Sequence, residues 1–170
     1  MSPTPFDRFP SSMRRARCTI WYMFTEDSVE IDAPPRLVWD VFTDVERWPE
    51  WTASVTSLTG LDGPALAVGR RFAIKQPGMA KLVWQVTELI PGASWTWVQR
   101  SPGARVAATH HVSARPGGGT LVRQQLDQRG ALGALVGRLM AKKTKRFLAL
   151  EARGLKARAE QLSRADGAHP

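Results

Sequence analysis

The spacing of apolar residues along the chain changes from strand-like to helix-like near residue 130. Between residues 54 and 129, short runs rich in Val, Thr, Trp and Leu are separated by turn signals such as Pro77-Gly78 and Pro91-Gly92. Runs of this length between such turns are typical of an antiparallel meander. The pattern predicts six strands, at residues 54–61, 70–76, 81–89, 95–100, 105–114 and 121–128.

One more strand and two short helices are expected before the meander. Residues 27–32 alternate apolar and charged side chains, which is the period of a half-buried strand. Asp32 can then cap a helix over residues 34–44, in which Pro34 occupies the first turn and apolar residues recur at helical spacing. A second short helix over residues 45–51 is interrupted by Pro49.

After Gly130 the apolar residues recur every three or four positions as far as Leu162, with Lys and Arg between them. The pattern predicts a helix over residues 132–163, about 48 Å long at 1.5 Å per residue. A twisted meander of six strands curls toward a half-barrel, and only this helix is large enough to cover its concave face. We therefore expect an α+β fold in which a seven-stranded curved antiparallel sheet wraps around a long C-terminal helix.

The 170 residues suit one domain with a sizeable core. Residues 1–19 have three prolines and no period, so we expect a disordered leader, a single domain over 20–163 and a frayed tail over 164–170. The single Cys18 excludes an internal disulfide and a multi-cysteine metal site. Because we find no signal peptide and no apolar run near the ~20 residues of a bilayer span, a cytoplasmic location is expected.

The net charge of +9 is distributed unevenly. Residues 24–66 hold nine acidic and two basic residues, whereas residues 132–170 hold nine basic and three acidic ones. A basic surface can attract nucleic acid or anionic lipid, but it is more often a solvated face. We therefore expect nucleic-acid binding to be non-specific at most.

The most distinctive run in the chain is Val29-Glu-Ile-Asp-Ala-Pro-Pro35, which leads into residues 38–44 and then Trp48-Pro-Glu-Trp51. Trp84-Gln-Val-Thr-Glu88 and Phe147-Leu-Ala-Leu-Glu151 add support. Together these runs resemble the START-like superfamily, specifically its bacterial polyketide cyclase/dehydrase-like (SRPBCC) branch, over residues 29–161. None of the matched runs is catalytic.

The resemblance implies a helix-grip fold around an apolar cavity that binds lipids, isoprenoid quinones, polyketides or other hydrophobic molecules. A minority of relatives are aromatase/cyclases, and a few have been described as ribosome-associated or toxin-type proteins. The expected function is therefore the binding of a small hydrophobic molecule, with no cofactor, no metal and no integral membrane contact. A polyketide cyclase or dehydratase using His110 is one alternative, and a protein that interacts with a ribosome or RNA is another.

Motifs of catalysis are scarce in this chain, which has no Gly-rich phosphate loop, no nucleophile elbow and no His-Glu-x-x-His. His110 and His111 are adjacent on a predicted strand, point to opposite faces and so suit a shared metal poorly. The alternation of apolar neighbours turns His110 toward the cavity. It is either a tolerated structural histidine or a ligand-contacting, acid/base one.

Seven tryptophans are the strongest oddity in the composition, and they can fill the core or line the cavity. Gln124 shares the inward face of its predicted strand with Val122 and Leu126, which makes it a candidate polar contact. The residues expected to line the cavity and bind the ligand are Phe72, Ile74, Trp84, Trp97, Ala108, His110, Val112, Gln124 and Leu139.

Overall fold

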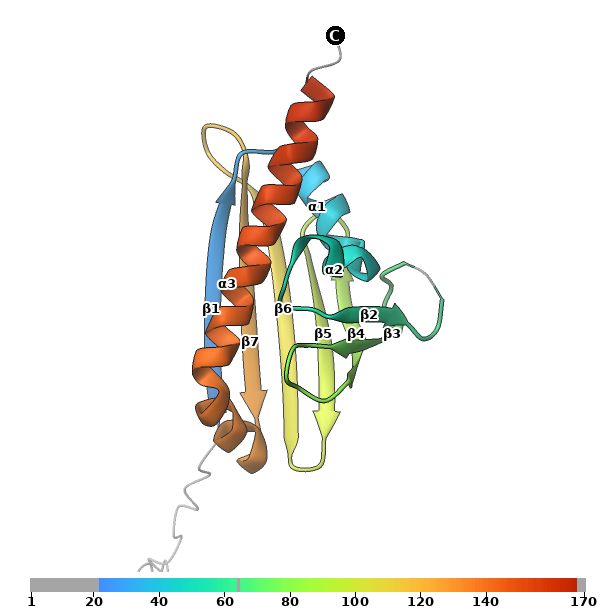
Figure 1. Cartoon of the computed structure of the whole chain (residues 1–170), viewed down its shortest axis with the longest axis vertical. Coiled ribbons are helices and arrows are strands. Elements are labelled where there is room, and N and C mark those ends of the chain that lie inside the picture. The colour runs from blue at the N-terminus through green and yellow to red at the C-terminus, as the bar shows by residue number, and fades with distance from the viewer. Residues whose placement is uncertain (1–21, 64, 168–170) are drawn as a thin grey trace, which may run out of the picture.

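One antiparallel sheet runs through the residues that the computed structural model describes, 22–63 and 65–167. Its seven strands lie in the order β1-β7-β6-β5-β4-β3-β2 (Figure 1). The strands are β1 (Tyr22–Ile31), β2 (Ser57–Gly60), β3 (Arg71–Lys75), β4 (Leu82–Ile90), β5 (Ser94–Ser101), β6 (Ala104–Ala114) and β7 (Thr120–Arg129). Strands β2 to β7 form the expected meander, and β1 closes the far edge by pairing with β7.

The helices are α1 (Pro35–Thr43), the 3-10 turn η1 (Val45–Arg47), α2 (Trp48–Trp51) and α3 (Ala131–Gly167). Figure 1 shows α3 lying lengthwise against the sheet, with α1 and α2 beside it, while β2 and β3 turn well away from the direction of β1 and β7. The expected helix-grip architecture is confirmed. Proline lies in the first turn of both α1 and α2, where a missing N–H costs no helical hydrogen bond.

Three boundaries differ from those expected from the sequence. Strand β1 begins at Tyr22 rather than at residue 27, because Tyr22 still has a pairing partner in Arg129 of β7. Strand β2 is shorter than residues 54–61, and the preceding Thr52 and Ser54 are buried with their hydroxyls 3.0 Å apart. Helix α3 continues to Gly167 rather than ending at residue 163, and the rest of the proposed tail, residues 168–170, lies outside the described residues. The proposed leader, residues 1–19, lies outside the described residues.

An aromatic cluster fills the core at the α1–α2 end of the sheet. Phe42 stacks on Trp48 with ring centroids 5.4 Å apart, and the indole N–H of Trp48 donates a hydrogen bond to the Phe42 carbonyl. Trp95 from β5 is fully buried and meets both rings. Aromatic rings therefore fill this end of the concave face.

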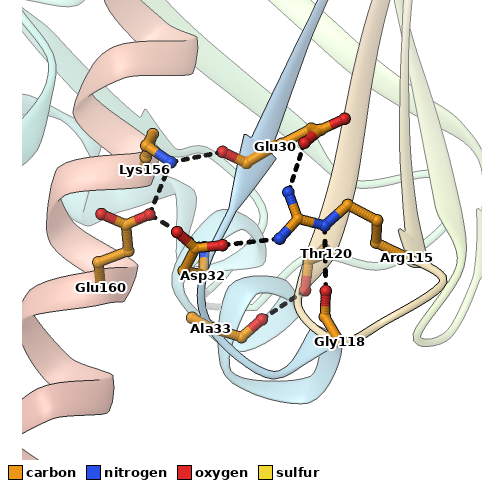
Figure 2. A network of polar contacts seen from close by, with 8 residues as sticks. All are labelled: Glu30, Asp32, Ala33, Arg115, Gly118, Thr120, Lys156 and Glu160. Carbon is orange, nitrogen blue, oxygen red and sulfur yellow. Dashed lines mark hydrogen bonds and ion pairs between the residues drawn. The ribbon is translucent and has the colours of Figure 1, made fainter.

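The C-terminal half of α3 is tied to the sheet by a polar network (Figure 2). Lys156 donates to the backbone carbonyl of Glu30 at 2.7 Å, and Glu160 accepts the backbone N–H of Asp32 at 2.9 Å. Arg115, from the loop between β6 and β7, forms ion pairs with Glu30 and Asp32. The network fixes the position of α3 along the direction of β1.

Close approach between α3 and α2 requires glycine at position 154. A methyl group on Gly154 would overlap the backbone carbonyl of Trp51, which cannot move without displacing α2. A methyl group added to Gly133, near the start of α3, would lie 3.5 Å from its nearest neighbour, the side chain of Ala104. That distance is an ordinary van der Waals contact.

The two glycines therefore respond in opposite directions to the same substitution. Gly154→Ala is expected to lower the free energy of unfolding by about 1–3 kcal/mol through overpacking. Gly133→Ala is expected to raise it by roughly 0.5–1 kcal/mol, because alanine costs less backbone entropy in a helix. Urea unfolding of both variants measures the difference, and a stabilised Gly154→Ala would show that α3 does not press on α2.

Candidate ligand-binding cavity

A cavity of about 360 Å³ lies between the concave face of the sheet and the N-terminal half of α3. Alternation along β3 to β7 turns every second side chain into it, and the helix supplies the opposite wall. Its size lies within the range of small-molecule sites. The apolar side chains of the wall include Val55, Ile74, Leu82, Trp84, Trp97, Ala108, Leu126, Met140, Phe147 and Leu148.

Small residues hold the N-terminal part of α3 close to the edge of the sheet. Gly133, Ala134 and Gly137 are buried, and a methyl group on Gly137 would overlap the side chain of Gln128 on β7. The helix therefore rests on one side against β7 and β1, while Val136 and Met140 on another side face the cavity.

The inner end of the cavity is polar. His110 on β6 and Glu151 on α3 are 3% and 7% exposed, and the His110 Nε2 atom lies 3.8 Å from the Glu151 Oε1 atom. Gln124 on β7 is buried behind them and donates a hydrogen bond from Nε2 to the same Glu151 oxygen. Trp48 also lines this end, so the polar pair is enclosed by aromatic rings.

Burial decides the charge of this pair. It raises the pKa of the Glu151 carboxyl to about 8 and lowers the pKa of the His110 imidazole to about 3. At neutral pH the site therefore holds an uncharged carboxylic acid beside an uncharged imidazole rather than an ion pair. The two groups offer a proton donor and a proton acceptor to whatever occupies the cavity.

A second polar group and a basic side chain lie further along the wall. The Gln128 Oε1 atom is buried and has no hydrogen-bond partner among the described residues. Lys143 on α3 donates a hydrogen bond at 3.0 Å to the Gly78 carbonyl, in the turn between β3 and β4. It thus connects the helix to the sheet across one side of the cavity.

Five of the nine residues expected to line the cavity do so, namely Ile74, Trp84, Trp97, Ala108 and His110. Gln124 contacts the cavity only through Glu151. Phe72 and Val112 were also expected on the wall, but both are buried in the solid core. Phe72 packs beside the Trp97 ring, with centroids 6.3 Å apart, and Val112 lies beyond His110 on the side filled by the aromatic cluster.

Leu139 was expected on the wall as well, and the structure corrects this: its side chain is 77% exposed. Leu139 follows the buried Gly137 by two positions, which is about 200° around a helix. It therefore points away from the sheet.

Glu151 is the main polar residue of the site that the sequence analysis did not single out. It lies three residues after Leu148 and four before Leu155, on the apolar stripe of the helix. An ionisable group on a buried face is rare unless it has a role or a partner. The carboxylate in this apolar stripe could therefore have identified Glu151 from the sequence.

The chain belongs to the family described as polyketide cyclase / dehydrase and lipid transport, which it matches over residues 25–160. No helix within the described ranges combines the length and apolar content that crossing a bilayer requires. Across residues 22–63 and 65–167 there is no cluster of three or more His, Cys, Asp or Glu side chains that could hold a metal ion. Independence from metals stays a prediction.

Solved structures with this fold come from bacteria and plants. The ZhuI aromatase/cyclase from Streptomyces sp. R1128 superposes with a TM-score of 0.70 at 18% identity, covering 86% of this chain and 98% of that one. The major latex-like protein 151 of Panax ginseng gives 0.64 at 15% identity, with 82% and 98% covered. A hypothetical protein from Helicobacter pylori gives 0.66 at 15%, with 94% and 99% covered. No curated protein matches the sequence significantly.

The raised pKa of Glu151 predicts a loss of stability as the pH rises. Between pH 6.5 and 8 the carboxyl is ionised in the unfolded chain but still protonated in the folded one, so unfolding releases a proton. His110, facing it from β6, is neutral in the folded protein throughout this window, whereas in the unfolded chain it still carries part of its charge near pH 6.5 and so offsets a small part of the loss; Gln124 does not titrate. We expect the free energy of unfolding to fall by about 1–2 kcal/mol across the window.

Urea unfolding at a series of pH values checks this, with Glu151→Gln as the test variant and Asp40→Asn, an exposed carboxylate, as the control. Glu151→Gln should flatten the dependence between pH 6.5 and 8, while Asp40→Asn should keep it. A wild-type protein as flat as Glu151→Gln would mean that the Glu151 carboxyl is already ionised at pH 6.5.

Proposed function

We propose that this protein binds a small hydrophobic molecule, of lipid, isoprenoid or polyketide type, in the cavity between the sheet and α3. The proposal depends above all on the cavity itself, whose wall is mostly aromatic and aliphatic. The neutral state of His110 and Glu151 supports it, because an uncharged polar end favours a ligand with a hydroxyl or carbonyl group over one with a buried anion. The family description, which includes lipid transport, agrees with this class of ligand.

Filling the cavity should abolish binding without unfolding the protein. Ala108 lies on the wall between Trp97 and Leu126 in the sheet register. A phenylalanine there would occupy open volume, so we expect Ala108→Phe to retain a cooperative unfolding transition while it loses affinity for an apolar fluorescent compound such as N-phenylnaphthylamine. Titration of that compound, followed by quenching of the cavity tryptophans, measures the effect.

Ala73→Phe is the matched control, because Ala73 lies on β3 between Phe72 and Ile74, whose side chains turn to the concave face. It should bind the compound as the wild-type protein does. Unchanged binding in Ala108→Phe would show that the compound does not enter the cavity. Native mass spectrometry of protein purified from its own host would then identify any molecule that is retained.

A second function, cyclase or dehydratase, is favoured by one specific observation. His110 and Glu151 are adjacent groups whose surroundings shift their pKa values in opposite directions, which is the pattern of an acid and base pair. On a polyketide-like substrate, neutral His110 could remove a proton from carbon next to a carbonyl, and protonated Glu151 could supply one to a departing hydroxyl.

His110→Ala separates the two functions. If the protein only binds, this variant should keep its affinity for N-phenylnaphthylamine nearly unchanged and no turnover should be measurable in either form. If it is a cyclase or dehydratase, turnover of a poly-β-ketone thioester should fall by roughly 10²–10⁴-fold while binding persists. Glu151→Gln should lower turnover as well, and full turnover in both variants would exclude the pair from catalysis.

A further inference from the structure

The first three turns of α3 expose an apolar stripe to solvent. Leu132, Leu135 and Val136 are 50%, 52% and 52% exposed, and Leu139 is 77% exposed. Of the ten large apolar side chains that are exposed among the described residues, these four lie within eight consecutive positions of one helix. Apolar groups that gather in this way mark interaction surfaces, whereas single exposed ones do not.

Positive charge accompanies the stripe. Residues 131–150 contain no acidic residue and five basic ones, Arg138, Lys142, Lys143, Lys145 and Arg146. None of the five forms an ion pair with a described carboxylate, although other cations of the chain, such as Arg115 and Lys156, do. On the helix, Lys142 and Arg146 follow Leu139 by three and seven positions and so flank the stripe. A partner with an anionic surface and an apolar interior matches this combination.

The stripe is continuous with the cavity. Leu132 and Val136 are half-exposed and also belong to the cavity wall, so the same side chains border both. A molecule that leaves the cavity along α3 therefore meets the apolar stripe before it meets water.

We propose that these turns of α3 are a docking surface for an anionic lipid bilayer, through which the apolar ligand passes between the bilayer and the cavity. The stripe would lie among the upper acyl chains and the basic side chains among the headgroups, as in other interfacial amphipathic helices. The passage of ligand rests on the proposed function, whereas the docking itself does not.

Charge disfavours two other ways of covering the stripe. A second copy placed on the stripe would bring the basic side chains that flank it, such as Lys142 and Arg146, close to those of the first copy. Strand β1 begins near the start of α3, because Tyr22 pairs with Arg129, two residues before the helix begins, so the part of the chain that precedes β1 is the second candidate. That segment is itself basic, with one acidic residue, Asp7, and four arginines, Arg8, Arg14, Arg15 and Arg17.

The test is co-sedimentation of the full chain with phosphatidylcholine vesicles, with and without phosphatidylglycerol. We expect binding to the anionic vesicles and little to the neutral ones. Leu135→Gln/Leu139→Gln, which keeps helix propensity, should lower the partition coefficient by about tenfold or more. Arg138→Gln/Lys142→Gln should lower it by about fivefold for each cation removed.

Two controls match these variants in chemistry but not in place. Leu61→Gln/Val68→Gln changes exposed apolar residues between β2 and β3, at the opposite edge of the sheet from β1, and should bind as wild type. Arg36→Gln/Arg164→Gln removes two exposed cations away from the stripe and should lose less than Arg138→Gln/Lys142→Gln. Equal losses in test and control pairs, or no binding by the folded wild type, would overturn the proposal.

Failure of docking and failure of the proposed function are distinguishable. The leucine variant should lose vesicle binding and still bind N-phenylnaphthylamine in solution, because neither leucine lines the cavity. Ala108→Phe should show the reverse. Sedimentation velocity completes the test: a wild-type dimer that becomes monomeric in Leu135→Gln/Leu139→Gln would show that a second copy, not a bilayer, covers the stripe.

Discussion

Covering the concave face of the sheet is the constraint on which the rest of this structure depends. Seven antiparallel strands bury most of their large apolar side chains on the concave face, and α3 is the one described helix long enough to lie along all of it. The short α1 and α2 help at one end, where Phe42, Trp48 and Trp95 complete a solid core. Toward the other end α3 is the only described helix over the concave face, and the cavity lies there.

The two halves of α3 are held in different ways, and this difference positions the site. Its C-terminal half is fixed by directional contacts, with Lys156 and Glu160 bound to the end of β1 (Figure 2). Its N-terminal half rests on small residues at the sheet edge, and its hydrogen bonds to the sheet side go only to turns, from Lys143 to the Gly78 carbonyl and from the Leu132 N–H to the Gly103 carbonyl. Glu151 lies between the halves, which is why it is both firmly placed and in contact with the cavity.

The protonation states of Glu151 and His110 at the inner end of the cavity are set by burial rather than by ion pairing. Within residues 22–63 and 65–167 no cation lies close enough to Glu151 to favour its ionised form, and desolvation by burial is the dominant cause of the pKa shifts of both Glu151 and His110. The result is a polar but uncharged end to an apolar cavity. A binding protein and an acid–base catalyst can both use such an end, and whether a reactive substrate reaches it separates the two.

Much of this architecture could be predicted from the sequence, because strand alternation and turn residues act locally. The direction of Ala108 and His110 follows from their positions on β6 alone, since neighbours on a strand alternate between faces. The side of α3 that faces the sheet could not be predicted in this way, because apolar residues occur nearly all around its first turns. Close contacts from other elements, of Gly137 with Gln128 and of Gly154 with Trp51, set its rotation. That rotation turned Leu139 to solvent and Glu151 inward, so the exposed stripe and the neutral acid were decided by tertiary structure.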